Sequence, residues 1–127
     1  MSKAKLILES MLRKFGHIDT VVARHGGVDG ALDDEPEGRA AILMNIVAIA
    51  EKFEQLKSME ATEILGQFDK ADIAGISKVR NKIAHHYDEI LLEPIKIIIE
   101  NDLPRVLSVI KAILQDGIVK EILKAEV

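Results

Sequence analysis

The sequence predicts an all-α protein, an up-and-down bundle of four to five helices, and three observations carry this prediction. Apolar residues recur at the three- and four-residue spacing of helices over most of the chain. Hydrophobic residues make up 48% of the 127 residues but aromatic residues only 3%, so the core must consist mainly of Leu, Ile, Val and Ala. No strand-like pair of alternating runs is visible. The length suits one domain covering residues 1–127.

The first half of the chain predicts two long helices joined by a loop. The first is expected over residues 2 to 24, with Ser2 as its N-cap. Residues 25 to 36 contain three Gly and four acidic residues, which predicts a solvated loop, and Pro36 suits the first turn of the next helix. That second helix should run from about residue 37 to residue 59, because its broad apolar face is typical of a central bundle helix.

The third helix is expected after a short turn at residues 61 to 66. Asp72 is a plausible N-cap for it, and the helical pattern continues to a break near Ile90. Pro94 then marks a new helical start, since proline is well tolerated in the first turn of a helix.

The last helix should begin at Asn101-Asp102-Leu103-Pro104, where Asp102 caps it and Pro104 occupies its first turn. It is expected to reach about Gln115. Gly117 then ends it, with room for a short tail helix beyond.

Composition excludes several classes of function. The chain has no Cys, which removes disulfides, thiolate catalysis and Cys-based zinc sites. Its net charge of −4 argues against general affinity for nucleic acid, so any RNA contact must be local, and no DNA binding is expected. No apolar run is long enough to span a membrane, and the N-terminus lacks the pattern of a signal peptide. We therefore expect a soluble cytoplasmic protein with no membrane contact.

The stretch from Arg80 to Tyr87 holds one Arg, one Asn, two His and the only Tyr within eight residues. Arg is a permanent, forked donor to phosphate oxygens, and His can accept or donate a proton near neutral pH. Lys78 and Lys82 add further positive charge beside them. This combination indicates chemistry on a phosphodiester that needs neither a metal nor a cofactor.

On a regular helix this motif would face outward. Ile76, Val79 and Ile83 would form the core stripe, with Tyr87 on or beside it, whereas His85 would point away from the core. Asn81 precedes His85 by one turn, and Arg80 could reach round from the side. Water screens charges on an exposed helix, so a working site needs a second surface. A homodimer about a two-fold axis would supply it and would bring two copies of the motif together.

Such a cleft could cleave RNA through its own 2′-hydroxyl. The two copies of His85 would serve as general base and general acid, each worth about 10² to 10⁴ in rate. Arg80 would hold the non-bridging phosphate oxygens, and Asn81 would orient His85 or the phosphate.

Arg80, His85 and Tyr87 form an R-x-x-x-x-H-x-Y pattern that resembles the signature of the HEPN superfamily, specifically its HepT-like toxins. Around Glu51, the stretch from residue 39 to residue 57 is similar to the second helix of that family, although Ala50 and Lys52 depart from its Gly-Glu-Ala. The Asp-Leu-Pro at residues 102–104 also matches. The resemblance covers roughly residues 39 to 114.

The resemblance implies an HEPN-like helical homodimer and a metal-independent endoribonuclease toxin with no cofactor. It also implies a partner, a nucleotidyltransferase antitoxin of the MntA type that attaches AMP to Tyr87. An anionic adduct beside Arg80 and His85 would repel and block RNA.

Other interpretations stay open. The protein could be a non-catalytic HEPN partner that holds nucleotide or substrate for a nucleotidyltransferase, or a purely structural helical dimer. Within the motif, Arg80 and His85 could form only a solvated helix face with an ion pair to Asp88. Glu51 could be a buried acid that reaches the motif or a plain surface charge. Lys82 and His86 are possible supporting residues, while His17 and His25 have no evident partner and are expected at the surface.

Overall fold

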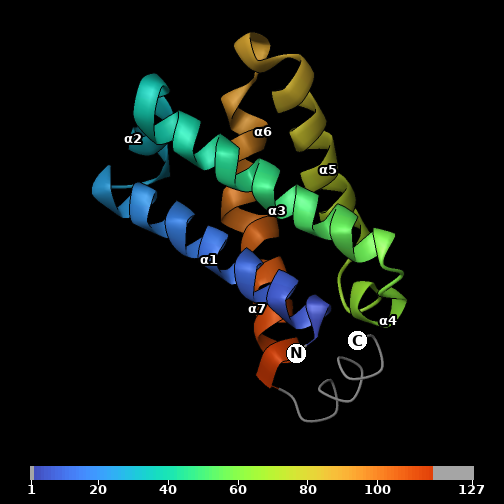
Figure 1. The fold of residues 1–127 in the computed structure, drawn as a ribbon. Coiled ribbons are helices and arrows are strands. Elements are labelled where there is room, and N and C mark those ends of the chain that lie inside the picture. Colours follow the sequence, from blue (N-terminus) through green and yellow to red (C-terminus); the bar gives the residue numbers. More distant parts are fainter. Residues whose placement is uncertain (1, 116–127) are drawn as a thin grey trace.

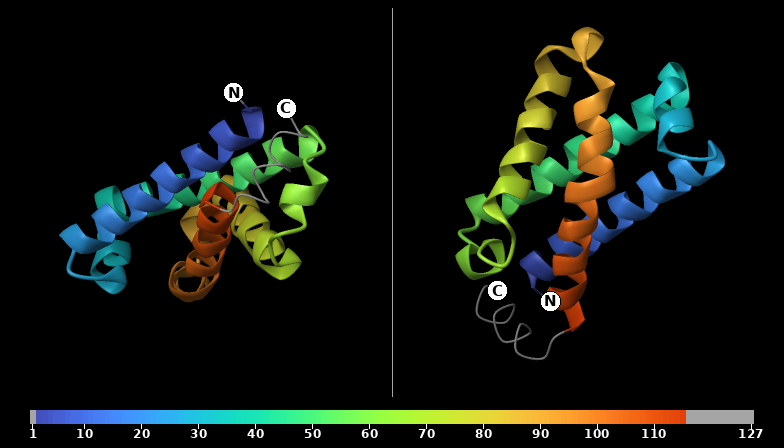
Figure 2. Two further views of the ribbon diagram at one scale, coloured as in Figure 1. Left: turned by 90° about the horizontal axis from the view of Figure 1, so that it is seen from below. Right: turned by 180° about the vertical axis from the view of Figure 1, so that it is seen from behind.

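The computed structural model describes residues 2–115, and all regular structure in this range is helical, as predicted. The long helices form two antiparallel pairs that cross one another (Figures 1 and 2). In one pair α1 (Lys3–Arg24) lies beside α3 (Ala40–Ser58). In the other, α5 (Lys70–His85) lies beside the segment that runs from α6 (Leu92–Ile97) into α7 (Leu103–Gln115). None of the described helices is both long and apolar enough to cross a bilayer.

The core lies between the two pairs and is mainly aliphatic, as the composition predicts. Among the described residues, one pair of aromatic rings is in contact: Phe53 of α3 and Phe68 meet edge to face with their centroids 5.1 Å apart. Most of the other large side chains that are fully buried are Leu and Ile: Leu8, Met11, Ile42, Leu43, Ile46, Ile49, Leu56, Ile64, Ile76, Ile110 and Ile113. Residues from every long helix therefore share one hydrophobic core.

The first helix forms as expected. Ser2 caps it, because its hydroxyl accepts a hydrogen bond from the backbone N–H of Lys5 at 3.2 Å. After Arg24 the chain turns through Gly26 and Gly27, whose φ angles of 73° and 145° are open to glycine without strain.

The loop predicted over residues 25 to 36 is wrong in part, because the segment contains α2 (Val28–Asp33) and the start of η1 (Glu35–Arg39), a turn of π-helix. Gly30 does not break the helix: a Cβ there would lie 2.4 Å from the carbonyl oxygen of His25, so glycine permits close packing. Pro36 lies in the first turn of η1, as predicted, and η1 leads directly into α3.

His25 was expected to be an unpartnered surface residue, and the structure corrects this. Its Nδ1 lies 2.8 Å from the carbonyl oxygen of Val21, and its Nε2 lies 2.8 Å from a carboxylate oxygen of Asp34. These contacts raise the pKa of His25, and the hydrogen bond to the Val21 carbonyl has the largest effect. The pKa of Asp34 is lowered, chiefly by its hydrogen bond to His25 and next by the hydrogen bond from the Gly38 amide. His17 also has a partner, since its Nδ1 lies 3.3 Å from Oδ1 of Asn45.

The turn predicted at residues 61 to 66 contains a short helix, α4 (Thr62–Leu65). The N-cap of α5 is Asp69 and not Asp72, because the Asp69 carboxylate accepts the backbone N–H of Ala71 at 2.8 Å. Asp72 is instead buried, with 4% of its surface exposed.

The helix that carries the motif ends five residues before the predicted break at Ile90. His86 leaves the helical region, with φ −141° and ψ 42°, and a short 3₁₀ turn, η2 (Tyr87–Glu89), follows. Ile90 and Leu91 are extended before α6 begins. Pro94 lies in the first turn of α6, as expected.

The predicted helix start at Asp102 is also wrong, because α6, η3 (Ile98–Asp102) and α7 form one continuous rod. At η3 the ladder widens to a π-turn, in which the N–H of Leu103 bonds to the carbonyl of Ile98, five residues earlier. This shift accommodates Pro104, which has no N–H to donate. The predicted end at Gly117 and the tail helix lie outside the described residues.

Candidate functional site

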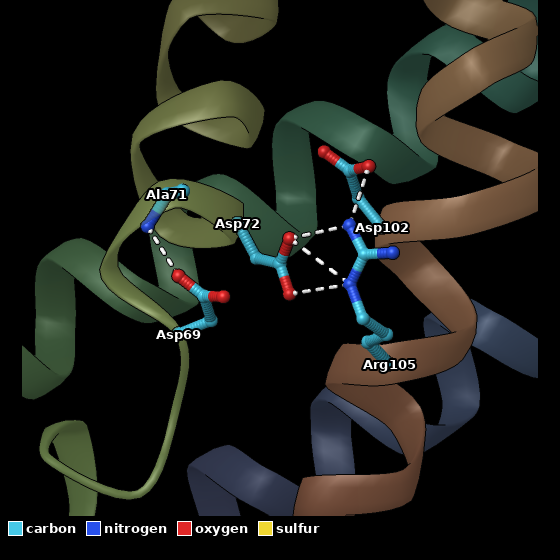
Figure 3. Close-up of polar contacts among 5 residues, drawn as sticks. All are labelled: Asp69, Ala71, Asp72, Asp102 and Arg105. Carbon is cyan, nitrogen blue, oxygen red and sulfur yellow. Dashed lines mark hydrogen bonds and ion pairs between the residues drawn. The ribbon is translucent and has the colours of Figure 1, made fainter.

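The helix α5 is held at its N-terminal end by a cluster of charged residues (Figure 3). Nη2 of Arg105 on α7 lies 2.8 Å from Oδ1 of the buried Asp72, and Nε lies 3.1 Å from its Oδ2. The same guanidinium reaches Asp102 at 3.1 Å. Burial, followed by the charge of Asp72, raises the pKa of Asp102, whereas the pKa of Arg105 is raised chiefly by its hydrogen bond to Asp72. This bidentate pair fixes α5 against α7.

The core contacts of α5 decide which side chains of the motif reach solvent. Ile76 and Val79 are buried and Ile83 is half-buried, as the predicted core stripe requires. At about 100° per residue, His85 is then about 160° from this stripe and about 40° from Asn81, one turn earlier. Arg80 lies about 140° from His85 around the same helix. A single α5 therefore presents Arg80 and His85 on different sides of Asn81.

Arg80 bends toward the exposed face of α5. It is half-buried, and its Nη1 donates a hydrogen bond to Oδ1 of Asn81 at 3.2 Å. Within residues 2–115 it forms no ion pair, so the alternative of an ion pair to Asp88 does not apply in this structure. The guanidinium is thus directed to the side of the helix where Asn81 and His85 are exposed.

His85 is the last residue of α5, and its side chain is exposed. In the described part of the chain its imidazole has no hydrogen-bond partner, which leaves both ring nitrogens accessible to a substrate. The prediction that His85 points away from the core agrees with this position.

Tyr87 lies beyond the end of α5, and not on the core stripe that a longer helix would have given it. It begins η2 and is 41% exposed. The early end of α5 at His86 therefore brings the Tyr87 ring to the surface, two residues from His85.

The three possible supporting residues lie in different surroundings. His86 is exposed, and its Nδ1 lies 3.9 Å from Oε2 of Glu89. Lys82 is exposed on α5, one turn before His86. Glu51 lies on the exposed side of α3 and, within residues 2–115, forms no ion pair or hydrogen bond with α5.

A groove of about 480 Å³ lies between α5 and the start of α6. Lys78 and Lys82 line it from α5, and Leu91 and Ile97 line it from the opposite side, where they are 70% and 48% exposed. The residues that line this groove do not include Arg80, His85 or Tyr87. One chain therefore offers the motif as a convex surface with an apolar groove beside it.

The exposed charged side chains of α5 are all cationic. The helix carries Lys70, Lys78, Arg80 and Lys82, and its one carboxylate, Asp72, is buried against Arg105. This positive strip occurs on a chain whose net charge is −4. A polyanion would thus find its favourable local potential along α5. Among the described residues no group of His, Asp and Glu is arranged to hold a metal ion.

Sequence reasoning missed the groove and the charged cluster beneath it. The apolar residues of positions 90–99 could have indicated the groove, because Ile97, Ile98 and Ile99 are consecutive and cannot all face one core. The pairing of Asp72 with Arg105 joins positions 33 residues apart, and no local pattern signals it.

Comparison with protein families identifies one match. The family described as "Ribonuclease HepT-like" matches residues 11–113, a range that contains the motif, the groove and the charged cluster. Comparison with functionally characterised proteins found no match, and neither did comparison with solved structures.

Proposed function

Since the chain belongs to the ribonuclease HepT-like family, we propose that it is a metal-independent endoribonuclease and the toxin of a toxin–antitoxin pair. One observation carries the proposal: the family match spans a motif in which Arg80 donates a hydrogen bond to Asn81, while the exposed His85, one turn after Asn81, has no hydrogen-bond partner among the described residues. A hydrogen-bond donor to the phosphate oxygens and a proton carrier are the two groups needed when the 2′-hydroxyl of RNA attacks the adjacent phosphodiester.

The proposed reaction needs two proton carriers and one phosphate clamp. One His85 accepts the proton of the 2′-hydroxyl as this oxygen attacks phosphorus. A second His85 protonates the 5′-oxygen as the phosphorus–oxygen bond breaks, which leaves a 2′,3′-cyclic phosphate and a 5′-hydroxyl. Arg80 stabilises the charge that develops on the non-bridging oxygens, and Asn81 holds the guanidinium in place.

The second His85 would come from a second copy of the chain. Arg80 and His85 lie about 140° apart around α5, so they cannot enclose a substrate within one copy. Two copies related by a two-fold axis would place Arg80 of one near His85 of the other and exclude water from the cleft. The exposure of His85 supports this arrangement.

We further propose that a nucleotidyltransferase antitoxin of the MntA type silences the toxin through Tyr87. The phenolic oxygen would attack the α-phosphorus of ATP, with pyrophosphate as the leaving group. Tyr87 is 41% exposed and lies two residues from His85, so an enzyme can reach it. The adenylate would place a phosphate beside Arg80 and His85, where it competes with RNA by charge and by volume. We expect the protein to act in the cytoplasm, where both its RNA substrate and the antitoxin would be present.

The test is cleavage of a labelled single-stranded RNA by the purified protein in EDTA. We expect cleavage to a 2′,3′-cyclic phosphate by the wild type and a loss of about 10² to 10³ in rate for Arg80→Ala. His85→Ala removes both proton carriers and should lose about 10⁴ or more. Lys111→Ala, which removes an exposed charge from α7, is the matched control and should cleave normally. A wild type that leaves RNA intact but binds a nucleotidyltransferase would replace this proposal with the non-catalytic partner role.

A further inference from the structure

We propose that the groove between α5 and α6 is a nucleotide-binding subsite, which accepts an unstacked nucleotide of the RNA next to the scissile phosphate. The inference rests on the proposed function and extends it, because it assigns the substrate class, single-stranded RNA, to a surface outside the motif. The groove holds about 480 Å³, within the range of sites for small ligands, which is about 300 to 1,000 Å³.

The lining of the groove suits the two parts of a nucleotide. The wall opposite α5 is apolar except for Glu93, and its residues Leu91 and Ile97 are 70% and 48% exposed. Such a wall can cover the face of a base. The α5 wall carries Lys78 and Lys82, spaced by four residues and therefore neighbours on the helix surface. Neither forms an ion pair in the described range, so both ammonium groups are available to phosphate.

The position of the groove relative to His85 supports the assignment. On α5, Lys78 lies two turns before His85 and within about 20° of it, while Lys82 lies about 60° away on the side of the groove. A smaller hollow, which shares Lys82 and Leu91 with the groove, extends to His86 at the end of the helix. The smaller hollow is also lined by Glu89. A strand that runs along Lys78 and Lys82 therefore arrives at His86 at the end of α5, the residue that follows His85 in the chain.

The positive charge of α5 favours RNA over a protein as the molecule bound in the groove. The exposed charges of α5 are all positive, although the whole chain has an excess of four negative charges. The opposite wall contributes one carboxylate, Glu93, which can accept hydrogen bonds from the amino group of a base. Only an unpaired base can turn into the groove, so single-stranded RNA should bind more tightly than a duplex.

The test measures RNA binding apart from cleavage. In the His85→Ala background, fluorescence anisotropy with a labelled 12-nucleotide single-stranded RNA gives Kd at several salt concentrations. Lys78→Ala and Lys82→Ala should each weaken binding and lower the slope of log K against log salt by about 0.7. Leu91→Ser should weaken binding about fivefold with no change of slope, because it removes apolar contact and no charge. Lys111→Ala is again the control and should bind as the parent does.

The outcomes separate this inference from the proposed function. If the wild type cleaves RNA while the groove variants bind and cleave like their parents, the groove is not a subsite and the ribonuclease stands. If RNA binding depends on the groove but the wild type does not cleave, the subsite stands and the nuclease fails. If Leu91→Ser instead turns a dimer into a monomer in sedimentation, a second copy covers the groove and the inference is overturned. Equal affinity for duplex and single strand would likewise overturn it.

Discussion

Replacing Asp72 by Asn tests the claim that a buried charge holds the motif helix in place. The substitution keeps the size of the side chain but removes its charge. The Asp72 carboxylate accepts contacts from Nε and Nη2 of Arg105, at 3.1 and 2.8 Å between the closest atoms. An Asn side chain offers one acceptor oxygen, and its amide group would face another N–H donor. One charge-assisted hydrogen bond is therefore lost on a side chain that is only 6% exposed.

The expected loss of stability is about 2 kcal/mol. A hydrogen bond to a charged group contributes about 1.5 to 3 kcal/mol, and the lower part of that range applies because the Arg105 side chain is 56% exposed and can be rehydrated. With an unfolding entropy of about 2.1 cal/mol/K per residue, a chain of 127 residues should lose about 7 °C of Tm.

The assay is calorimetric unfolding of Asp72→Asn alone and in the Arg105→Gln background. If the ion pair is responsible, the Asp72 substitution costs much less once Arg105 has been replaced. Asp102→Asn is a matched control and should change Tm by less than about 3 °C, because Asp102 accepts only one contact from Arg105 and burial already disfavours its charge. An equal loss of Tm in both backgrounds would refute the reasoning.

Three further predictions follow from the same structure. His25→Gln should lower Tm most at about pH 5 to 6, where the raised pKa of His25 and the lowered pKa of Asp34 leave both groups charged. The difference in Tm between the variant and the wild type should shrink as pH rises through the pKa of His25. A difference in Tm that does not depend on pH would contradict the pairing. Gly38→Ala should destabilise the fold by about 1 to 3 kcal/mol, because the new Cβ would lie 2.4 Å from the carbonyl oxygen of Ala31. Gly16→Ala in α1 should instead stabilise the fold by about 0.5 to 1 kcal/mol, because its Cβ would meet nothing within 4 Å. Denaturant titration measures the change in unfolding free energy for each variant. Tyr87→Phe should cleave RNA normally but gain no adenylate in intact-mass spectra after co-expression with a nucleotidyltransferase of the MntA type, if the proposed antitoxin acts on this residue. An adduct that survives the substitution would exclude Tyr87 as the modified residue.

The parts of the fold that sequence alone predicted are those decided by local pattern. The first helix and α3 have long, regular apolar faces, and Ser2 is an unambiguous cap at the start of α1. The sequence does not determine which residue caps α5, because Asp69 and Asp72 are equally good capping residues three positions apart. The ion pair with Arg105, 33 positions along the chain, holds Asp72 in the interior, so Asp69 caps the helix.

The predicted helix ends are wrong where no Gly or Pro marks the end of the helix. Between Ile83 and Pro94 the chain contains neither Gly nor Pro, so nothing in the sequence signals that α5 ends at His85. Pro104 predicted a new helix start where none exists, because a π-turn allows a proline within a continuous helical rod.

The candidate site was predictable as residue types and not as geometry. The exposure of His85 follows from the spacing of the core residues of α5, and the position of Tyr87 depends on where that helix ends. The contact between Arg80 and Asn81 depends on a rotamer that spacing does not determine. Whether Arg80 and His85 share a cleft depends on a second copy of the chain, a relation that lies outside any single sequence.

Mixing two inactive variants tests the shared cleft most directly. Arg80→Ala and His85→Ala protein are purified separately, combined under conditions that exchange subunits, and assayed for cleavage of a labelled single-stranded RNA. A mixed dimer keeps one guanidinium and one of the two imidazoles, whereas the Arg80→Ala dimer has no guanidinium and the His85→Ala dimer has no imidazole. The mixture should therefore cleave faster than either variant alone, and more slowly than the wild type because it lacks one proton carrier. A mixture no more active than its components, from a wild type that cleaves RNA, would contradict a site built from two copies.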